Sequence, residues 1–186
     1  MKKMLLTLTV LALSLSSSCA KATNDRNTLP LDGDENTPTL QTAVAAPVLK
    51  SIPTTVSPEQ VFSTIAQQYK GSVTFIDFWA TWCPPCRQAM KQVDLIKPAL
   101  TAKGCKFVYV TGETSPRADF DTMYKTIEGD HFYLTDAQYK GLLGQFDVEG
   151  IPHYILLDKE GKVIWQHTGY PGNDEVQSQI EVALAK

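Results

Sequence analysis

Two cysteines, Cys83 and Cys86, enclose a pair of prolines where an apolar run gives way to a helical pattern. The run over residues 73–79 is mostly apolar and aromatic, which is typical of a strand buried on both faces. Residues 87–93 then begin a helical pattern. We therefore expect Cys83 at the N-terminus of a helix that directly follows a central strand, as in folds of the α/β class.

That position suits a dithiol that opens and closes. The first turn of a helix has unpaired N–H groups and partial positive charge, which stabilise a thiolate and make Cys83 the candidate nucleophile. Cys86 lies one turn further along, where it can attack a mixed disulfide on Cys83. Pro84 and Pro85 lack N–H groups and stiffen the ring that joins the two sulfurs.

The alternative interpretation of this cysteine spacing is half of a zinc site or a structural staple. Zinc needs two further Cys or His ligands at suitable spacing, and the chain offers only the scattered His131, His153 and His167. Redox chemistry is therefore favoured over metal binding, and we expect no metal and no bound cofactor. The remaining thiol of the same region, Cys105, alternates with aromatic residues along a strand and is expected to be buried and inert.

Composition and charge exclude some functions. The chain has 186 residues, 43% of them hydrophobic, which supports one domain with a proper core. Its formal net charge is −3, so nucleic acid is not an expected partner.

Residues 1–22 read as an export signal that does not belong to the fold. Lys2 and Lys3 precede an apolar stretch over residues 4–15 that is too short to span a bilayer. Two processing sites compete: a small-x-small cleavage site at residues 20–22, and a bacterial lipoprotein signal in which Cys19 is lipidated. In the lipoprotein interpretation, Leu15 lies four residues before Cys19, whereas such signals usually have this residue three before the cysteine. We nevertheless favour the lipoprotein signal.

The next segment, residues 23–56, is rich in Thr, Pro, Asn, Asp and Ala, with no sustained apolar period, and is predicted to be a disordered tether. The folded domain is predicted over residues 57–186. It opens with a helix that begins at Ser57-Pro58, and strands and helices then alternate. The further expected elements are a strand (106–111), a helix (116–127), a short strand (131–134), a helix (135–146), a hairpin (153–158 with 162–167) and a final helix (173–184).

Two segments resemble motifs of the thioredoxin fold: residues 78–87, Phe-Trp-Ala-Thr-Trp-Cys-Pro-Pro-Cys-Arg, and residues 148–152, Val-Glu-Gly-Ile-Pro. The extra helix–strand–helix material between residues 112 and 146, together with the export signal, resembles the TlpA/ResA group of extracytoplasmic thiol-disulfide oxidoreductases. The resemblance implies a three-layer α/β/α thioredoxin fold with a mixed central sheet, that insertion and an N-terminal helix.

The resemblance also implies roles for single residues. Pro152 matches the family's cis-proline, whose loop faces the dithiol and offers the Ile151 backbone to an extended substrate. Trp82 shapes the surface beside the nucleophile and, with the two intervening prolines, is expected to contact substrate. Asp77 matches a buried acid that takes the proton of Cys86. From the residues alone, a carboxylate in such an apolar strand must be protonated or hydrogen-bonded.

These expectations describe an exported, periplasmic reductase of protein disulfides, anchored to a membrane if Cys19 is lipidated. Its partners would be disulfide-bonded exported clients and a membrane thiol carrier that supplies electrons. Two alternatives stay open. The dithiol could serve an oxidase or isomerase, or Cys83, Cys86 and His153 could bind copper in a thioredoxin-like chaperone.

Overall fold

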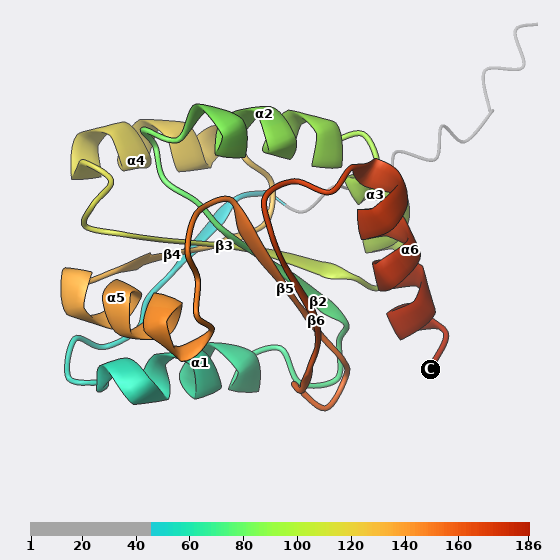
Figure 1. Ribbon diagram of the computed structural model, residues 1–186, viewed down its shortest axis with the longest axis horizontal. Helices are drawn as coiled ribbons and strands as arrows, with labels where there is room; N and C mark the ends of the chain where they lie inside the picture. Colours follow the sequence, from blue (N-terminus) through green and yellow to red (C-terminus); the bar gives the residue numbers. More distant parts are fainter. Residues whose placement is uncertain (1–45) are drawn as a thin grey trace, which may run out of the picture. The chain divides into compact units, whose positions relative to one another are not determined.

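A six-stranded mixed sheet forms the centre of the computed structural model, which describes residues 46–186 (Figure 1). The strands lie in the order β1-β4-β3-β2-β5-β6. Neighbours among the first four are parallel, whereas β5 runs antiparallel to both β2 and β6. Their bounds are β1 Val48–Lys50, β2 Thr74–Phe78, β3 Lys106–Gly112, β4 Asp130–Leu134, β5 His153–Leu157 and β6 Val163–Thr168.

Helices cover both faces of the sheet and complete three layers (Figure 1). One face carries α1 and α5, and the other carries α2, α3, α4 and α6. The helices are α1 Pro58–Gln67, α2 Pro84–Val93, α3 Lys97–Ala102, α4 Arg117–Met123, α5 Asp136–Gln145 and α6 Asn173–Leu184, with a single 3-10 turn, η1 Tyr124–Thr126, after α4. Within residues 46–186, no helix is long and apolar enough to cross a membrane.

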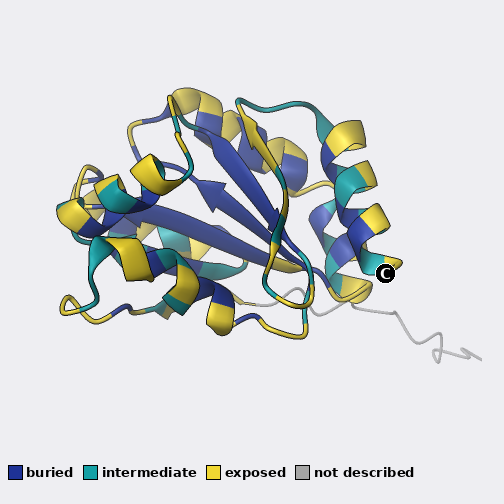
Figure 2. Ribbon diagram, turned by 60° about the horizontal axis from the view of Figure 1, so that its bottom comes forward, coloured by how far each residue is buried: buried dark blue, intermediate teal, exposed yellow. Residues whose placement is uncertain are grey.

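Two hydrophobic clusters lie on opposite sides of the sheet. Figure 2 shows that the central strands are coloured as buried. Every residue of β2 is buried because the strand lies between β3 and β5 and helices cover both of its faces. Since side chains alternate along a strand, Phe75 contributes to the cluster beneath α2, and Ile76 and Phe78 contribute to the cluster beneath α1 and α5. The apolar run that suggested a doubly buried strand is thereby explained.

Most expected elements are present, and several have the expected ends. Thr135 caps α5 through a reciprocal pair of bonds with Gln138, each 3.3 Å long. The final helix covers residues 173–184 as predicted. Pro58 stands in the first turn of α1, although the side chain of Ser57 makes no capping bond. Pro98 belongs to the first turn of α3, so the active-site helix ends before it, at Val93.

The fold begins earlier than the predicted boundary at Ser57. Residues 48–50 of the expected tether form β1, a strand at the edge of the sheet that pairs with β4. Ile52 is buried, and the Gln138 side chain donates hydrogen bonds to the carbonyls of Pro53 and Val56. Three residues between prolines carry too little pattern to predict a strand, and β1 exists because β4 offers a free edge. Residues 23–45 of the expected tether and the export signal, with Cys19, lie outside the described residues.

Candidate active site

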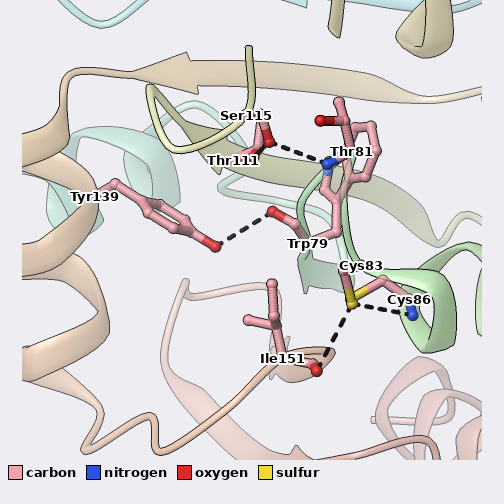
Figure 3. Close-up of a disulfide and its surroundings, with 8 residues drawn as sticks. All are labelled: Trp79, Thr81, Cys83, Cys86, Thr111, Ser115, Tyr139 and Ile151. Carbon is pink, nitrogen blue, oxygen red and sulfur yellow. Dashed lines mark hydrogen bonds between the residues drawn. A yellow bond between two sulfur atoms is a disulfide. The ribbon is translucent and has the colours of Figure 1, made fainter. Parts of the chain in front are cut away.

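Cys83 occupies the N-cap of α2, and a disulfide joins it to Cys86 (Figure 3). Its backbone is extended while that of Pro84 is already helical, so its sulfur lies at the open end of the helix. The backbone N–H of Cys86 donates a hydrogen bond to Cys83 Sγ across 3.2 Å. This donor and the helix dipole both favour negative charge on Cys83 Sγ once the disulfide is reduced.

The two cysteines differ in their access to solvent. Cys83 retains 3% of its surface and Cys86 is fully covered, in the cluster beneath α2. Trp82, Pro84 and Pro85 are exposed around the disulfide. An incoming sulfur can therefore approach Cys83 from this exposed surface, while Cys86 can be reached only from within the protein.

The loop before β5 faces the disulfide. The Ile151–Pro152 peptide bond is cis, as predicted. The Ile151 carbonyl oxygen lies 3.8 Å from Cys83 Sγ (Figure 3). In the closed disulfide this sulfur has no hydrogen to donate, so the approach is a contact and becomes a weak hydrogen bond only with a thiol. A hydrogen bond of 2.8 Å, donated by the Gly169 N–H to the Pro152 carbonyl, fixes this loop to the segment after β6.

Bonds to the segment after β3 hold the loop that leads to Cys83. The Thr81 N–H donates to Ser115 Oγ at 3.0 Å, and this hydroxyl also pairs with that of Thr111 (Figure 3). Trp82 is 57% exposed, yet its indole N–H donates to the Thr114 carbonyl at 2.9 Å. Sequence reasoning missed Thr111, Thr114 and Ser115, because nothing local links this segment to the dithiol.

Asp77 lies on the face of β2 that α2 covers, two residues from Phe75 and in the same orientation. Only 2% of it is exposed, and its Oδ1 has no hydrogen-bond partner among the described residues. Burial raises the pKa of the Asp77 carboxyl well above its usual range, and the positive charge of Lys97 opposes this shift. The sequence required this carboxyl to be protonated or hydrogen-bonded, and the unpartnered Oδ1 and the raised pKa favour the protonated form. Its role in taking the proton of Cys86 stays a prediction.

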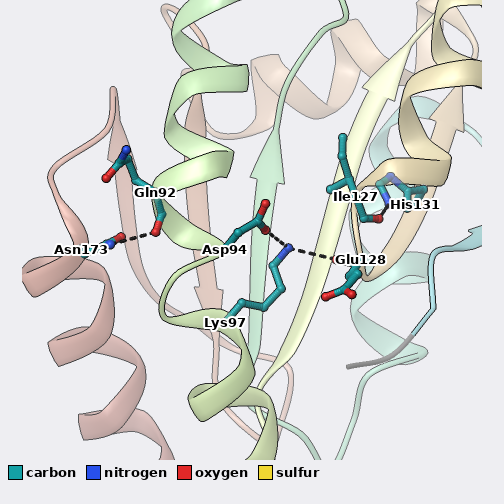
Figure 4. A network of polar contacts seen from close by, with 7 residues as sticks. All are labelled: Gln92, Asp94, Lys97, Ile127, Glu128, His131 and Asn173. Carbon is teal, nitrogen blue, oxygen red and sulfur yellow. Dashed lines mark hydrogen bonds and ion pairs between the residues drawn. The ribbon is translucent and has the colours of Figure 1, made fainter. Parts of the chain in front are cut away.

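Lys97 is a buried cation that the sequence analysis did not identify. Its side chain is 3% exposed, and Nζ pairs with Asp94 and donates to the Glu128 carbonyl at 3.2 Å (Figure 4). The ammonium group also lies 5.1 Å from the centre of the Tyr109 ring. The separation of Asp94 and Lys97 by three residues was the available signal, but such pairs usually lie on an exposed helix surface.

The sequence profile of the Redoxin family matches residues 40–184. The chain belongs to the Redoxin family. That match begins before β1, in agreement with the position of this strand in the sheet.

Relatives of this Redoxin-family chain carry the name that the sequence resemblance suggested. It is 29% identical to thiol-disulfide oxidoreductase ResA of Bacillus thuringiensis over 119 residues, 63% of this chain and 64% of the relative. The ResA protein of Bacillus anthracis matches equally well. The alignment thus spans slightly less than two thirds of these relatives.

Solved structures give the same fold. A candidate thiol:disulfide interchange protein DsbE from Chlorobium tepidum is 29% identical, with a TM-score of 0.53 over 63% of this chain and 84% of its own. A thiol:disulfide interchange protein of the thioredoxin family from the same organism has a TM-score of 0.54 at 23% identity, over 64% and 84% of the two chains. The predicted thioredoxin fold of this Redoxin-family member is confirmed.

Two other residues singled out in the sequence, His153 and Cys105, are buried. His153 Nδ1 forms a hydrogen bond of 2.8 Å with the Thr168 hydroxyl. The His153 ring packs against Phe78, which belongs to the cluster beneath α1 and α5. Burial lowers the pKa of His153. Cys105 is buried, and burial raises the pKa of its thiol to about 12, which keeps it protonated. Within residues 46–186, no three His, Cys, Asp or Glu side chains gather as a metal site.

Proposed function

We propose that this Redoxin-family protein is a thiol-disulfide oxidoreductase that reduces disulfides of client proteins outside the cytoplasm. The observation that carries the proposal is the position of Cys83 Sγ at the open end of α2, 3.2 Å from the Cys86 N–H. This arrangement favours a thiolate on the cysteine that a client can approach. The names of the ResA relatives support the class of activity.

The reaction uses the two cysteines in sequence. The Cys83 thiolate attacks one sulfur of the client disulfide, and the other client sulfur leaves as a thiolate. Cys86 then gives its proton to Asp77 and attacks Cys83 Sγ. The bond between Cys83 and the client breaks, the Cys83–Cys86 disulfide forms, and the client has gained two electrons. The buried position of Cys86 protects this second thiol from reaction with other partners.

The client is proposed to bind as an extended segment beside Cys83. Its backbone would pair with Ile151, and Trp82, Pro84 and Pro85 would contact its side chains. Support comes from the exposure of these three residues around Cys83 and from the 3.8 Å approach of the Ile151 carbonyl to the sulfur. A groove of about 610 Å³ beside Trp82, bounded by Arg87 and residues of α4, offers further space.

The extracytoplasmic location and the reductive direction rest on sequence. Residues 1–22 have the pattern of an export signal, and Cys19 has a lipoprotein-like setting. In an oxidising compartment the oxidised pair must be reduced again, which requires a membrane thiol carrier as electron donor. Metabolic labelling with a tagged fatty acid tests the anchor, because labelled wild type and unlabelled Cys19→Ser protein are expected.

The deciding experiment is the reduction potential of the Cys83–Cys86 pair, measured in redox buffers with Cys105→Ser as the background. We expect a value near that of thioredoxin, about −270 mV, which favours donation of electrons. A value near that of DsbA, about −120 mV, would contradict the reductive direction and make the protein an oxidase or isomerase.

A trapping experiment tests the order of the two cysteines. The Cys86→Ser variant is expected to retain a client as a mixed disulfide on Cys83, because the resolving thiol is missing. The matched Cys83→Ser variant should trap nothing, since Cys86 is fully buried. Equal trapping by both variants would contradict the assigned roles.

A further inference from the structure

A row of polar side chains crosses the sheet at the level of Asp77. On one side of Asp77, Tyr109 stands directly opposite on β3, and His131 is opposite Tyr109 on β4. On the other side, Tyr154 stands opposite on β5, and His167 is opposite Tyr154 on β6. Five neighbouring strands therefore each contribute one titratable residue at the same register position.

The two tyrosines flank the Asp77 carboxyl on the face that α2 covers. Phe75 stacks on the Tyr154 ring at 5.2 Å between centroids, and Tyr109 belongs to the same cluster. Directly opposite residues on one face of a sheet have Cβ atoms about 5 Å apart, so a phenol ring stands on each side of the carboxyl. Tyr154 is fully covered and Tyr109 is 2% exposed.

Four polar atoms in this row have no hydrogen-bond partner among the described residues: Asp77 Oδ1, the hydroxyls of Tyr109 and Tyr154, and Nδ1 of His131. Buried polar atoms normally have partners, so a group of orphaned ones requires an explanation, and a redox or catalytic role is one of those known. Other buried tyrosines here use their hydroxyls. Tyr69 donates to Asp130 at 2.8 Å, and Tyr139 donates to the Trp79 carbonyl at 3.3 Å.

We propose that Tyr109 and Tyr154 are positioning residues for Asp77, whose hydroxyls donate hydrogen bonds to its carboxylate while Cys86 attacks. The inference rests on the proposed function, because it concerns the step in which Cys86 resolves the mixed disulfide. Before the step, the carboxyl must be ionised in order to accept a proton. Afterwards it is neutral, the Cys83–Cys86 bond has formed, and the client sulfur has left as a thiolate.

The need for such donors follows from burial. An ionised carboxylate in an apolar interior is strongly destabilised unless hydrogen bonds or an opposite charge compensate it. The nearby cation cannot do this alone, because Asp94 and the Glu128 carbonyl already bind the Lys97 ammonium group. Two phenol hydroxyls on flanking strands supply donors without adding charge, and each favours the ionised form of Asp77.

Other titratable groups surround Asp77 on the elements packed against it. Cys86 comes from α2, and Lys97 from α3 carries its partner Asp94. His131 on β4 and His167 on β6 end the row, and His131 Nε2 donates to the Ile127 carbonyl at 2.7 Å (Figure 4). On the opposite face, burial and then negative charge at Asp77 raise the pKa of Tyr139 on α5. Burial, followed by negative charge at Asp77 and Tyr170, raises the pKa of Tyr154. Tyr109 and Tyr154 differ from all of these groups in two ways. They stand directly opposite Asp77 on the neighbouring strands, and their hydroxyls have no other hydrogen-bond partner among the described residues.

The pH profile of the resolving step tests the proposal. The reduced full chain, with Cys19→Ser, is mixed with one equivalent of 5,5′-dithiobis(2-nitrobenzoic acid), and release of its coloured thiolate is followed in stopped flow. The first phase forms the mixed disulfide on Cys83, and the second is attack by Cys86. The rate of the second phase should rise with pH as Asp77 ionises. Tyr154→Phe and Tyr109→Phe are each expected to move its midpoint upward, by up to about one pH unit.

The control is Tyr69→Phe, which removes a buried phenol hydroxyl from the opposite face. It should leave the midpoint in place. If both row variants keep the wild-type midpoint while Asp77→Asn abolishes the pH dependence, the positioning role is wrong and the proposed function stands. If the two variants slowed the second phase equally at every pH, the positioning role would also be contradicted, because such a change indicates a structural role alone. Loss of the second phase in the wild type would overturn the proposed function and this inference together.

Discussion

The backbone N–H of Cys86 points at Cys83 Sγ across 3.2 Å, so the resolving cysteine stabilises the nucleophile through its own amide. Pro84 and Pro85, between them, have no N–H to offer, which leaves the Cys86 amide as the first donor that the helix can present. The Cys-Pro-Pro-Cys arrangement thus concentrates donation from the helix terminus on one atom. It also keeps the two sulfurs within one helical turn.

Replacement of Trp82 by alanine should weaken reaction with protein clients more than reaction with a small disulfide. The indole is 57% exposed beside Cys83, and covering such a surface contributes about 1–2 kcal/mol, or roughly a tenfold rise in KM. The rate with 5,5′-dithiobis(2-nitrobenzoic acid) should change less than about twofold. The control is Leu95→Ala, which removes another exposed apolar side chain between α2 and α3. Equal losses on both substrates would argue against client contact by Trp82.

Asp77→Asn should change how stability depends on pH. Because burial raises the pKa of Asp77, the native state holds a proton that the unfolded chain releases above about pH 4. This contribution is fully present below that pH and is lost as the pH rises toward the raised pKa, at up to about 1.4 kcal/mol per pH unit. Asparagine does not titrate, so the variant should gain stability relative to the wild type with rising pH.

Denaturant unfolding of the oxidised protein between pH 5 and pH 8 measures this effect. The exposed Asp119→Asn change on α4 serves as the control and is unfolded at the same pH values. A constant difference for Asp77→Asn would show that this carboxyl is ionised in the native state.

His131 should produce the opposite slope. Burial lowers the pKa of His131 to about 4. Between about pH 6.5 and pH 4, the unfolded chain therefore binds a proton at this histidine and the native state does not. The stability from neutral His131 is present above about pH 6.5 and is lost on acidification, by about 3 kcal/mol at pH 4. His131→Gln should therefore be less stable than wild type at pH 7 and recover most of that deficit at pH 4. His167→Gln, at the exposed end of β6, is the matched control for unfolding at both pH values.

Cys105 should be unreactive in the native protein. Burial raises the pKa of its thiol to about 12, so almost no thiolate exists at pH 8. In the reduced chain with Cys19→Ser, 5,5′-dithiobis(2-nitrobenzoic acid) should oxidise the Cys83–Cys86 pair at once and reach the third thiol only in denaturant. Rapid reaction of all three thiols without denaturant would show that the strand around Cys105 opens readily.

Local patterns were sufficient for most elements of the fold. The capping sequence at Thr135, the alternation of the hairpin and the apolar run before Cys83 each involve residues close together in the chain, and each prediction is confirmed. The strand β1 was missed for the converse reason. It has three residues, two of them exposed, and its hydrogen bonds come from β4, far along the chain.

In the candidate site, too, the local features were predictable and the features that depend on distant residues were not. The sequence by itself determined the dithiol, its place at a helix start and the presence of a carboxyl in a buried strand, because spacing and hydrophobic pattern are local properties. Only the tertiary structure decided what surrounds them. The register of β3 and β5 against β2 places Tyr109 and Tyr154 directly opposite Asp77, and the packing of α3 brings the charge of Lys97 close enough to act on it. The protonation of a buried group depends on such neighbours and on its burial, which no short segment of the chain specifies.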